Sequence, residues 1–199
     1  MLKFVIIESV RHELIVEKSR FIAYLAPINS EGDFANFLQK VKKEASGARH
    51  YPYAYTLENT NKASDDGEPS GTAGRPLLDL LLNHKLSNSA VIVVRYFGGI
   101  KLGAGRLLRT YVETANQAIS QTDKYIRIPS YKYEATIKSS SLQHIEYLFL
   151  KANINISDRQ YYGEEVKIQF EAEQLVDISS IFNVEAKVLD TSYIFRKEE

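Results

Sequence analysis

The sequence predicts an α+β protein of two domains, residues 1–128 and 129–199. In the first part, runs rich in Val, Ile, Phe and Tyr alternate with stretches of helical periodicity. In the second, the predicted elements follow the order β-α-β-β-α-β of a ferredoxin-like unit. Between them, Ile128-Pro129-Ser130 is predicted to be a linker, because proline interrupts both helices and strands. The charge balance also changes sign there, from 17 Lys and Arg against 13 Asp and Glu to 8 against 12.

The first half of domain one reads as strands followed by a helix. Phe4–Val10 and Leu14–Ala26 are predicted to be paired strands, since they are rich in β-branched and aromatic residues. Helix-start chemistry at Ser30–Asp33 precedes an apolar stripe of helical spacing, formed by Phe34, Phe37, Leu38, Val41 and Ala45. Tyr51, Tyr53, Tyr55 and Leu57 then alternate with other residues, as in a strand.

The rest of domain one surrounds two glycine-containing segments. Glu58–Arg75 shows no periodicity and is predicted to be a long loop. A helix is expected from Pro76, with Leu77, Leu78, Leu81 and Leu82 facing inward. Ala90–Val94 is predicted to be a strand covered on both faces. A glycine-rich turn and a helix over Gly105–Ser120 follow.

In domain two, strands are expected at Tyr131–Lys138, Ile154–Tyr162, Val166–Ala172 and Ala186–Phe195, with helices at Leu142–Ala152 and Leu175–Phe182. Ser140–Gln143 is predicted to be a capping box, and Gly163-Glu164 a hairpin turn. One face of this sheet is expected to be polar, through Lys132, Glu134, Lys167, Gln169 and Glu171. That face is a candidate surface for a protein partner.

Composition excludes several classes of function. The chain has no cysteine, so disulfides, zinc–thiolate sites and thiol catalysis are ruled out. It contains no run of about 18 apolar residues, which a membrane helix requires, and a charge follows the first apolar stretch too soon for a secretory signal. We therefore expect a cytoplasmic protein that does not enter a membrane. A net charge of zero argues against indiscriminate coating of nucleic acid, but the positive first domain leaves room for a local basic patch.

The first candidate site is the glycine-rich segment Arg95–Tyr111, between the buried strand and the helix. Glycines allow close approach of a ligand to the backbone, and a helix start binds anions through free N–H groups. The expected phosphate- or RNA-binding residues are Arg95, Gly98, Gly99, Lys101, Gly103, Gly105, Arg106 and Arg109. The spacing matches neither a Walker A loop nor a Rossmann motif. The alternative is a tight turn with solvated basic residues.

The second candidate is the acidic loop that ends at Pro76. Its residues of interest are Asp65, Asp66, Gly67, Glu68, Gly71, Thr72 and Gly74. The three carboxylates are suitable ligands for Mg²⁺, but their spacing departs from an EF-hand and suits a turn equally well. We therefore predict an ordered, functionally shaped loop, with no metal and no cofactor. A metal-assisted enzyme using His50, Asp65, Asp66 and Glu68 stays open as the alternative, although no catalytic residue is assigned.

The third candidate is His50 with the tyrosine strand. His50 is a candidate acid–base group, and Tyr53 belongs to a face that would stack nucleic-acid bases. Aromatic residues on a pleated face more often belong to the core, which is the favoured interpretation. No serine or acidic partner lies at a spacing typical of a catalytic triad.

These segments together resemble the IMPACT family in its bacterial, two-domain YigZ-type form. The matching stretches are Lys18–Ala23, Ala48–Tyr55, Asp65–Pro76 and Arg95–Gly105, with Arg109 and Tyr111 beyond them. Pro52 stands where cysteine is common in the family, and Arg106 where another glycine is usual. The two long glycine-containing signatures occur in the expected order, which makes the resemblance highly specific.

The resemblance implies an N-terminal α+β domain like that shared by a small-subunit ribosomal protein and elongation factor G. It also implies a ferredoxin-like C-terminal domain, in agreement with the order of elements above. Eukaryotic relatives regulate translation, and bacterial members have been suggested to bind nucleic acid. The resemblance thus implies a translation-associated regulatory protein with RNA or the ribosome as partner, while fold transfers between relatives more safely than function.

Overall fold

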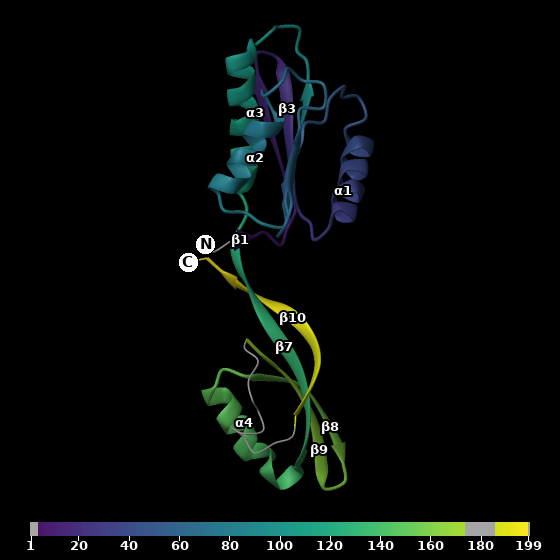
Figure 1. Ribbon diagram of the computed structural model, residues 1–199, viewed down its shortest axis with the longest axis vertical. Coiled ribbons are helices and arrows are strands. Elements are labelled where there is room, and N and C mark those ends of the chain that lie inside the picture. Colours follow the sequence, from purple (N-terminus) through teal and green to yellow (C-terminus); the bar gives the residue numbers. More distant parts are fainter. Residues whose placement is uncertain (1–3, 174–185, 199) are drawn as a thin grey trace. The chain divides into compact units, whose positions relative to one another are not determined.

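The computed structural model of the protein describes residues 4–173 and 186–198. The chain forms two compact units, one of Met1–Ile126 with Lys197–Glu199 and the other of Arg127–Arg196. Each unit contains one antiparallel sheet, with helices packed on it (Figure 1). The α+β class predicted from the sequence is confirmed. Among the described residues, no helix is long and apolar enough to cross a membrane.

The first unit is a three-layer arrangement around a five-stranded sheet of order β2-β3-β6-β4-β5. Its strands are β2 (Val10–Val16), β3 (Ser19–Pro27), β4 (Tyr53–Thr56), β5 (Asn61–Ser64) and β6 (Ser89–Tyr96). Its helices are α1 (Glu31–Glu44), α2 (Gly74–Asn83) and α3 (Ala104–Ile119). Helices α2 and α3 cover one face of the sheet and α1 covers the other (Figure 1).

Strand β6 is the centre of this unit, as its apolar sequence predicted. Ala90–Val94 are fully buried because alternate side chains enter two separate cores. One core lies under α2 and α3 and contains Phe21 and Tyr111, whose rings meet edge to face at 5.3 Å. The other lies under α1 and contains Tyr55. A central strand buried on both faces holds the segments at its ends in fixed positions.

Helix boundaries follow the local capping chemistry. The side chain of Ser30 caps α1, with its Oγ accepting the N–H of Asp33 at 3.0 Å, as the sequence predicted. Helix α2 begins at Gly74, before the Pro76 start that was expected. Leu77 and Leu81 are fully buried, but Leu82 is 43% exposed, so its predicted inward orientation is wrong.

The predicted strand pair at the N-terminus is divided differently in the structure. Strand β1 covers only Phe4–Val5, and β2 and β3 are joined by the two-residue turn Glu17-Lys18. Both turn residues have positive φ, 49° and 63°, as a type I′ hairpin requires. The turn was missed because neither residue is the glycine, asparagine or aspartate that usually marks such a position.

The loop predicted over Glu58–Arg75 is shorter than expected, because it contains β5. This edge strand pairs only with β4, and its side chains are exposed or half-buried. It therefore has no alternation of buried and exposed residues for a sequence pattern to reveal. The true connection runs from Asp65 to Ala73, directly between β5 and α2.

The second unit contains α4 (Leu142–Lys151), β8 (Asn155–Tyr162), β9 (Glu165–Ala172) and all but the terminal residues of β7 (Tyr125–Lys138) and β10 (Ala186–Lys197). Strand β9 lies between β7 and β8, and β10 also pairs with β7, as in a ferredoxin-like sheet. The predicted hairpin turn at Gly163-Glu164 is confirmed, with Tyr162 opposite Glu165. The helix predicted at 175–182 lies outside the described residues.

Two local predictions for the second unit are wrong. Pro129 lies within β7 and is not part of a linker. β1 pairs with Tyr125 and Ile126 and β9 pairs from Tyr131 onward, so neither of these two strands requires an N–H from Pro129. The capping box is also absent, since Ser139–Ser141 form a 3₁₀ turn and Ser141 makes no side-chain capping bond.

The polar face expected on the second sheet is present. Side chains of β9 alternate between buried and partly exposed. On the outer face, Lys167 Nζ lies 3.1 Å from Glu134 Oε1, and Gln169 donates to Glu134 at 3.3 Å. Glu171 accepts a hydrogen bond from Ser130. A protein partner for this face stays a prediction.

Candidate functional site

The Asp65 carboxylate organises the acidic loop between β5 and α2. Its Oδ2 accepts the N–H of Gly71 at 2.8 Å, while Oδ1 accepts those of Ala73 at 3.0 Å and Gly74 at 2.8 Å. Ala73, the residue that precedes α2, has no side chain able to cap the helix, so Asp65 does this from outside it. Burial raises the pKa of Asp65, but the three hydrogen bonds outweigh it and hold the pKa below its ordinary value.

Asp66 and Gly67 attach the same loop to the segment before β4. Asp66 Oδ2 accepts the N–H of Tyr51 at 2.6 Å, and the Asp66 carbonyl lies 2.7 Å from His50 Nδ1. Gly67 has φ +87°, and a Cβ there would lie 2.8 Å from His50 Nδ1. Since a carbonyl only accepts hydrogen bonds, Nδ1 carries the hydrogen, and in the neutral ring Nε2 has the free lone pair.

Glu68 enters a buried polar cluster. Its Oε1 accepts the hydroxyl of Tyr111 at 2.8 Å, and its Oε2 lies 3.8 Å from Arg95 Nη1. The side chains of Glu68 and Arg95 are only 7% and 13% exposed. Burial, followed by the negative charge of Glu68, raises the pKa of Tyr111 far above its usual range, so the phenol stays protonated and donates. The three residues join the acidic loop, β6 and α3.

The turn between β6 and α3 packs directly on the β2–β3 hairpin. The N–H of Gly98 donates to Ser19 Oγ at 3.1 Å, and a Cβ on Gly98 would lie 2.0 Å from the carbonyl carbon of Lys18. Only glycine fits against the neighbouring backbone at that distance. Gly99 and Gly103 instead adopt positive φ, 87° and 75°, with open space around them.

The start of α3 is open to solvent. Gly103 provides no side-chain cap, and Ala104 and Gly105 are exposed, so the first N–H groups of the helix face outward. Arg106 Nη1 lies 2.7 Å from Glu17 Oε1 and is therefore ion-paired with the hairpin. Lys101 and Arg109 are exposed and have no ion pair or hydrogen bond to any described residue.

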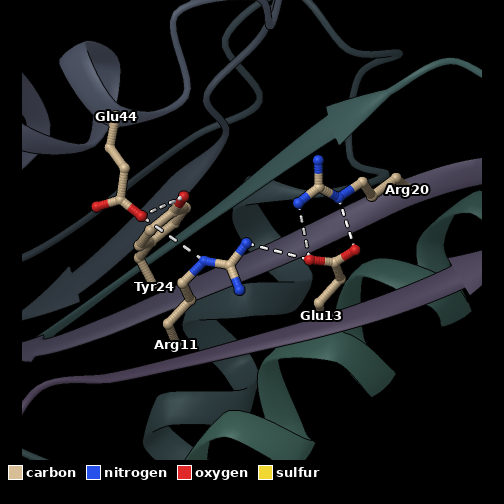
Figure 2. A network of polar contacts seen from close by, with 5 residues as sticks. All are labelled: Arg11, Glu13, Arg20, Tyr24 and Glu44. Atoms are coloured by element: carbon tan, nitrogen blue, oxygen red, sulfur yellow. Dashed lines mark hydrogen bonds and ion pairs between the residues drawn. The ribbon is translucent and has the colours of Figure 1, made fainter.

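Most other arginines of the first unit have acidic partners. Figure 2 shows one network, in which Arg20 and Arg11 both contact Glu13, and Arg11 reaches Glu44 beside the Tyr24 hydroxyl. Arg75 pairs with Asp79. Of the seven arginines of this unit, Arg49 and Arg109 are the two that have no partner among the carboxylates the structure describes. Their charges remain available to a ligand.

A cleft of about 450 Å³ opens beside the buried cluster. Its lining consists of Gly47, Arg49, His50, Glu68, Arg95, Tyr96 and Phe97. The fold thus brings His50 together with Glu68 and Arg95, three residues singled out by sequence. Lys101, Arg106 and Arg109 do not line this cleft. The candidate residues therefore divide between the cleft and the start of α3.

The remaining candidates have structural contacts. Asp65 and Asp66 accept hydrogen bonds from backbone N–H groups, and Thr72 Oγ1 donates to the carbonyl of Pro69 at 2.6 Å. The ring of Tyr53 packs 4.7 Å from that of Phe34, within the core under α1, as the favoured interpretation expected. Among the residues that the structure describes, no group of three or more His, Asp or Glu is placed to hold a metal ion.

Sequence reasoning missed several residues of the site. Arg49 and Phe97 line the cleft, Tyr111 binds Glu68, and Glu17 neutralises Arg106. Arg49 and Phe97 lie within stretches that carry the family resemblance and are adjacent to selected candidates, which was the signal available in the sequence. Tyr111 and Glu17 are 43 and 89 residues away from their partners, so no local pattern connects them.

The fold and these signature segments match those of a known family. The model of the "Impact N-terminal domain" matches residues 17–119, which is more than half of the chain. The chain therefore belongs to the IMPACT family. The matched range includes every residue of the cleft and of the α3 start described above.

Individual relatives agree. The chain is 43% identical to the IMPACT family member YvyE of Bacillus subtilis over 120 residues, 59% of this chain and 55% of that protein. It is 34% identical to the IMPACT family member YigZ of Escherichia coli over 151 residues, 73% and 74% of the two chains. A crystal structure described as that of a hypothetical protein superposes with a TM-score of 0.65 at 27% identity, covering 96% of this chain and 98% of that one.

Replacing Gly98 by alanine should destabilise the protein. The added Cβ would meet the backbone of Lys18 at 2.0 Å, and backbone cannot swing aside as a flexible side chain can. We expect the free energy of unfolding, measured by urea denaturation, to fall by roughly 1–3 kcal/mol or more. Gly105→Ala is the matched control: no atom lies within 4 Å of its Cβ, so stability should be unchanged or raised by up to about 1 kcal/mol. Equal losses in both variants would contradict this packing.

Replacing Asp65 by alanine should lower stability by roughly 1–3 kcal/mol, because three backbone donors lose their acceptor. Asp79→Ala, which removes an exposed ion pair from α2, should change it by only about 0.5 kcal/mol. The folded-state pKa of Asp65 lies below its ordinary value of 3.8. The charged carboxylate therefore contributes its full share to the free energy of unfolding above pH 3.8, and this share is lost as the pH falls through the folded-state pKa. Urea titrations at decreasing pH should show the difference between wild type and Asp65→Ala shrinking. A difference independent of pH would contradict the role of the charged carboxylate.

Proposed function

We propose that this chain is a translation-associated regulatory protein that binds RNA, the ribosome or another phosphate-bearing ligand at the start of α3. The binding surface consists of the turn 98–103, which includes the exposed Lys101, and of the exposed Arg109 on α3. The observation that carries the proposal is the presence of two cations, without an ion pair to any described residue, beside a helix N-terminus that has no side-chain cap. Free N–H groups and the helix dipole favour an anion there, and the cations add to that attraction.

The shape of the turn supports contact with a phosphate backbone. Nothing lies within 4 Å of a Cβ built on Gly99, Gly103 or Gly105, so a ligand can approach the main chain closely. Contacts of this kind fix the position of a nucleic acid without reading its sequence. Arg106 differs from the neighbouring cations because Glu17 already neutralises it. We therefore assign the main electrostatic contribution to Lys101 and Arg109.

The translational setting rests on family membership, since the resemblance set out above implies translational regulation. The bacterial relatives that the chain matches carry only the family name. The enzyme alternative has less support, because Asp65 and Asp66 have their carboxylates directed to backbone N–H groups of the protein itself.

Reversing the charges of Lys101 and Arg109 should abolish most of the binding. Purified wild-type protein and the Lys101→Glu/Arg109→Glu variant would be co-sedimented with ribosomes and titrated with a single-stranded oligoribonucleotide. We expect at least tenfold weaker binding, and a shallower dependence on salt because fewer counterions are released.

The matched control is Lys40→Glu/Lys43→Glu, which makes the same charge change at exposed positions. Lys40 and Lys43 lie on α1, on the opposite face of the sheet. This control should bind as wild type does. Equal loss in both double variants would indicate a response to net charge alone, and undiminished binding by Lys101→Glu/Arg109→Glu would refute the proposed surface.

A further inference from the structure

The cleft contains a buried cation whose donors lack acceptors. Arg95 carries five N–H donors, but it makes no hydrogen bond to any described residue, and its Nε is fully buried without a partner. Its contacts are the 3.8 Å ion pair with Glu68 and the faces of two rings, Phe21 at 5.5 Å and Phe97 at 5.3 Å. Buried donors without acceptors are rare in folded proteins because they are unfavourable. Because Arg95 lines the cleft, a ligand there could accept hydrogen bonds from its Nη groups, although the buried Nε is out of reach.

An exposed aromatic ring borders the same cleft. Phe97 is 59% exposed, unusual for a phenylalanine next to a buried strand. The Arg95 guanidinium lies over its ring and fixes it beside the cleft. A planar group entering the cleft can stack on this ring, as nucleic-acid bases stack on aromatic side chains.

The polar groups of the cleft fit the edge of a base and a phosphate. With Nδ1 donating to the Asp66 carbonyl, His50 Nε2 is available to accept a hydrogen bond, for example from an amino group of a base. Arg49 is exposed and has no ion pair or hydrogen bond within the described residues. The charge of the buried Glu68 repels a phosphate from the interior, so the phosphate is expected at Arg49 on the rim.

We propose that this cleft binds one nucleotide, with its base on Phe97, the base edge at His50 and the phosphate at Arg49. The volume of about 450 Å³ lies within the range of about 300–1,000 Å³ typical of small-molecule sites. The nucleotide is either free or the exposed nucleotide of a single-stranded RNA. The site is separate from Lys101 and Arg109, so it does not depend on the function proposed above.

Isothermal titration calorimetry of the full chain with AMP and UMP tests the site, with adenosine and inorganic phosphate as partial ligands. We expect the nucleotides to bind at least tenfold more tightly than either part. Phe97→Ala should weaken nucleotide binding roughly tenfold by removing the stacking ring. Arg49→Ala should weaken AMP severalfold and leave adenosine unchanged. Both side chains are exposed, so the variants should fold, and Lys43→Ala on α1 serves as a control that binds normally.

The results separate the two sources of the nucleotide. Displacement of AMP by a single-stranded oligoribonucleotide would assign the site to RNA, and AMP binding without displacement would assign it to a free nucleotide. Binding of AMP no tighter than inorganic phosphate, or insensitive to Phe97→Ala, would overturn the proposal. That outcome would not bear on the ribosome binding proposed for Lys101 and Arg109. In the same way, failure of ribosome binding would not bear on the nucleotide site in the cleft.

Discussion

The capping of α2 by the Asp65 carboxylate is the contact on which the arrangement of the site depends. The carboxylate of Asp65, the first residue of the acidic loop, accepts hydrogen bonds from the backbone N–H groups of Gly71, Ala73 and Gly74 at the end of that loop. With both ends fixed, Asp66 and Glu68 are directed in opposite ways, one to the Tyr51 backbone and the other to Tyr111 and Arg95. A loop rich in glycine loses much conformational entropy when it becomes ordered. The hydrogen bonds to the charged Asp65 carboxylate offset that loss.

The chemical consequence is that the acidic residues serve the fold while cations face the solvent. A carboxylate that accepts two or three hydrogen bonds from its own chain is a poor ligand for a metal and a poor base. Arg49, Lys101 and Arg109 have no such partners among the described residues, and the start of α3 is open, an arrangement that favours anions electrostatically. We therefore propose that in this chain the acidic loop is a scaffold and the basic, glycine-rich turn is the binding surface.

Sequence alone predicted the parts of the fold governed by local pattern. The uninterrupted apolar run Ala90–Val94 identified a doubly covered strand, and Ser30 identified a helix start, because each depends on neighbouring residues. Three features could not be predicted, since pairing with distant strands stabilises them against weak local preferences. They are the hairpin at Glu17-Lys18, the strand through Pro129 and the edge strand Asn61–Ser64. For the site, the signatures selected His50, Glu68 and Arg95, but nothing local indicated that Arg106 would be neutralised by Glu17.

We propose that phosphate-bearing ligands bind at the edge formed by the end of β6, the turn 98–103 and the start of α3. The most direct measurement is a two-dimensional ¹⁵N–¹H NMR titration of the full chain with a single-stranded oligoribonucleotide. We predict that the backbone amide signals of Gly98–Arg109 shift as RNA is added, while those of α1 and of the second sheet remain in place. Shifts confined to the second sheet or to α1, or no shifts at all, would contradict it.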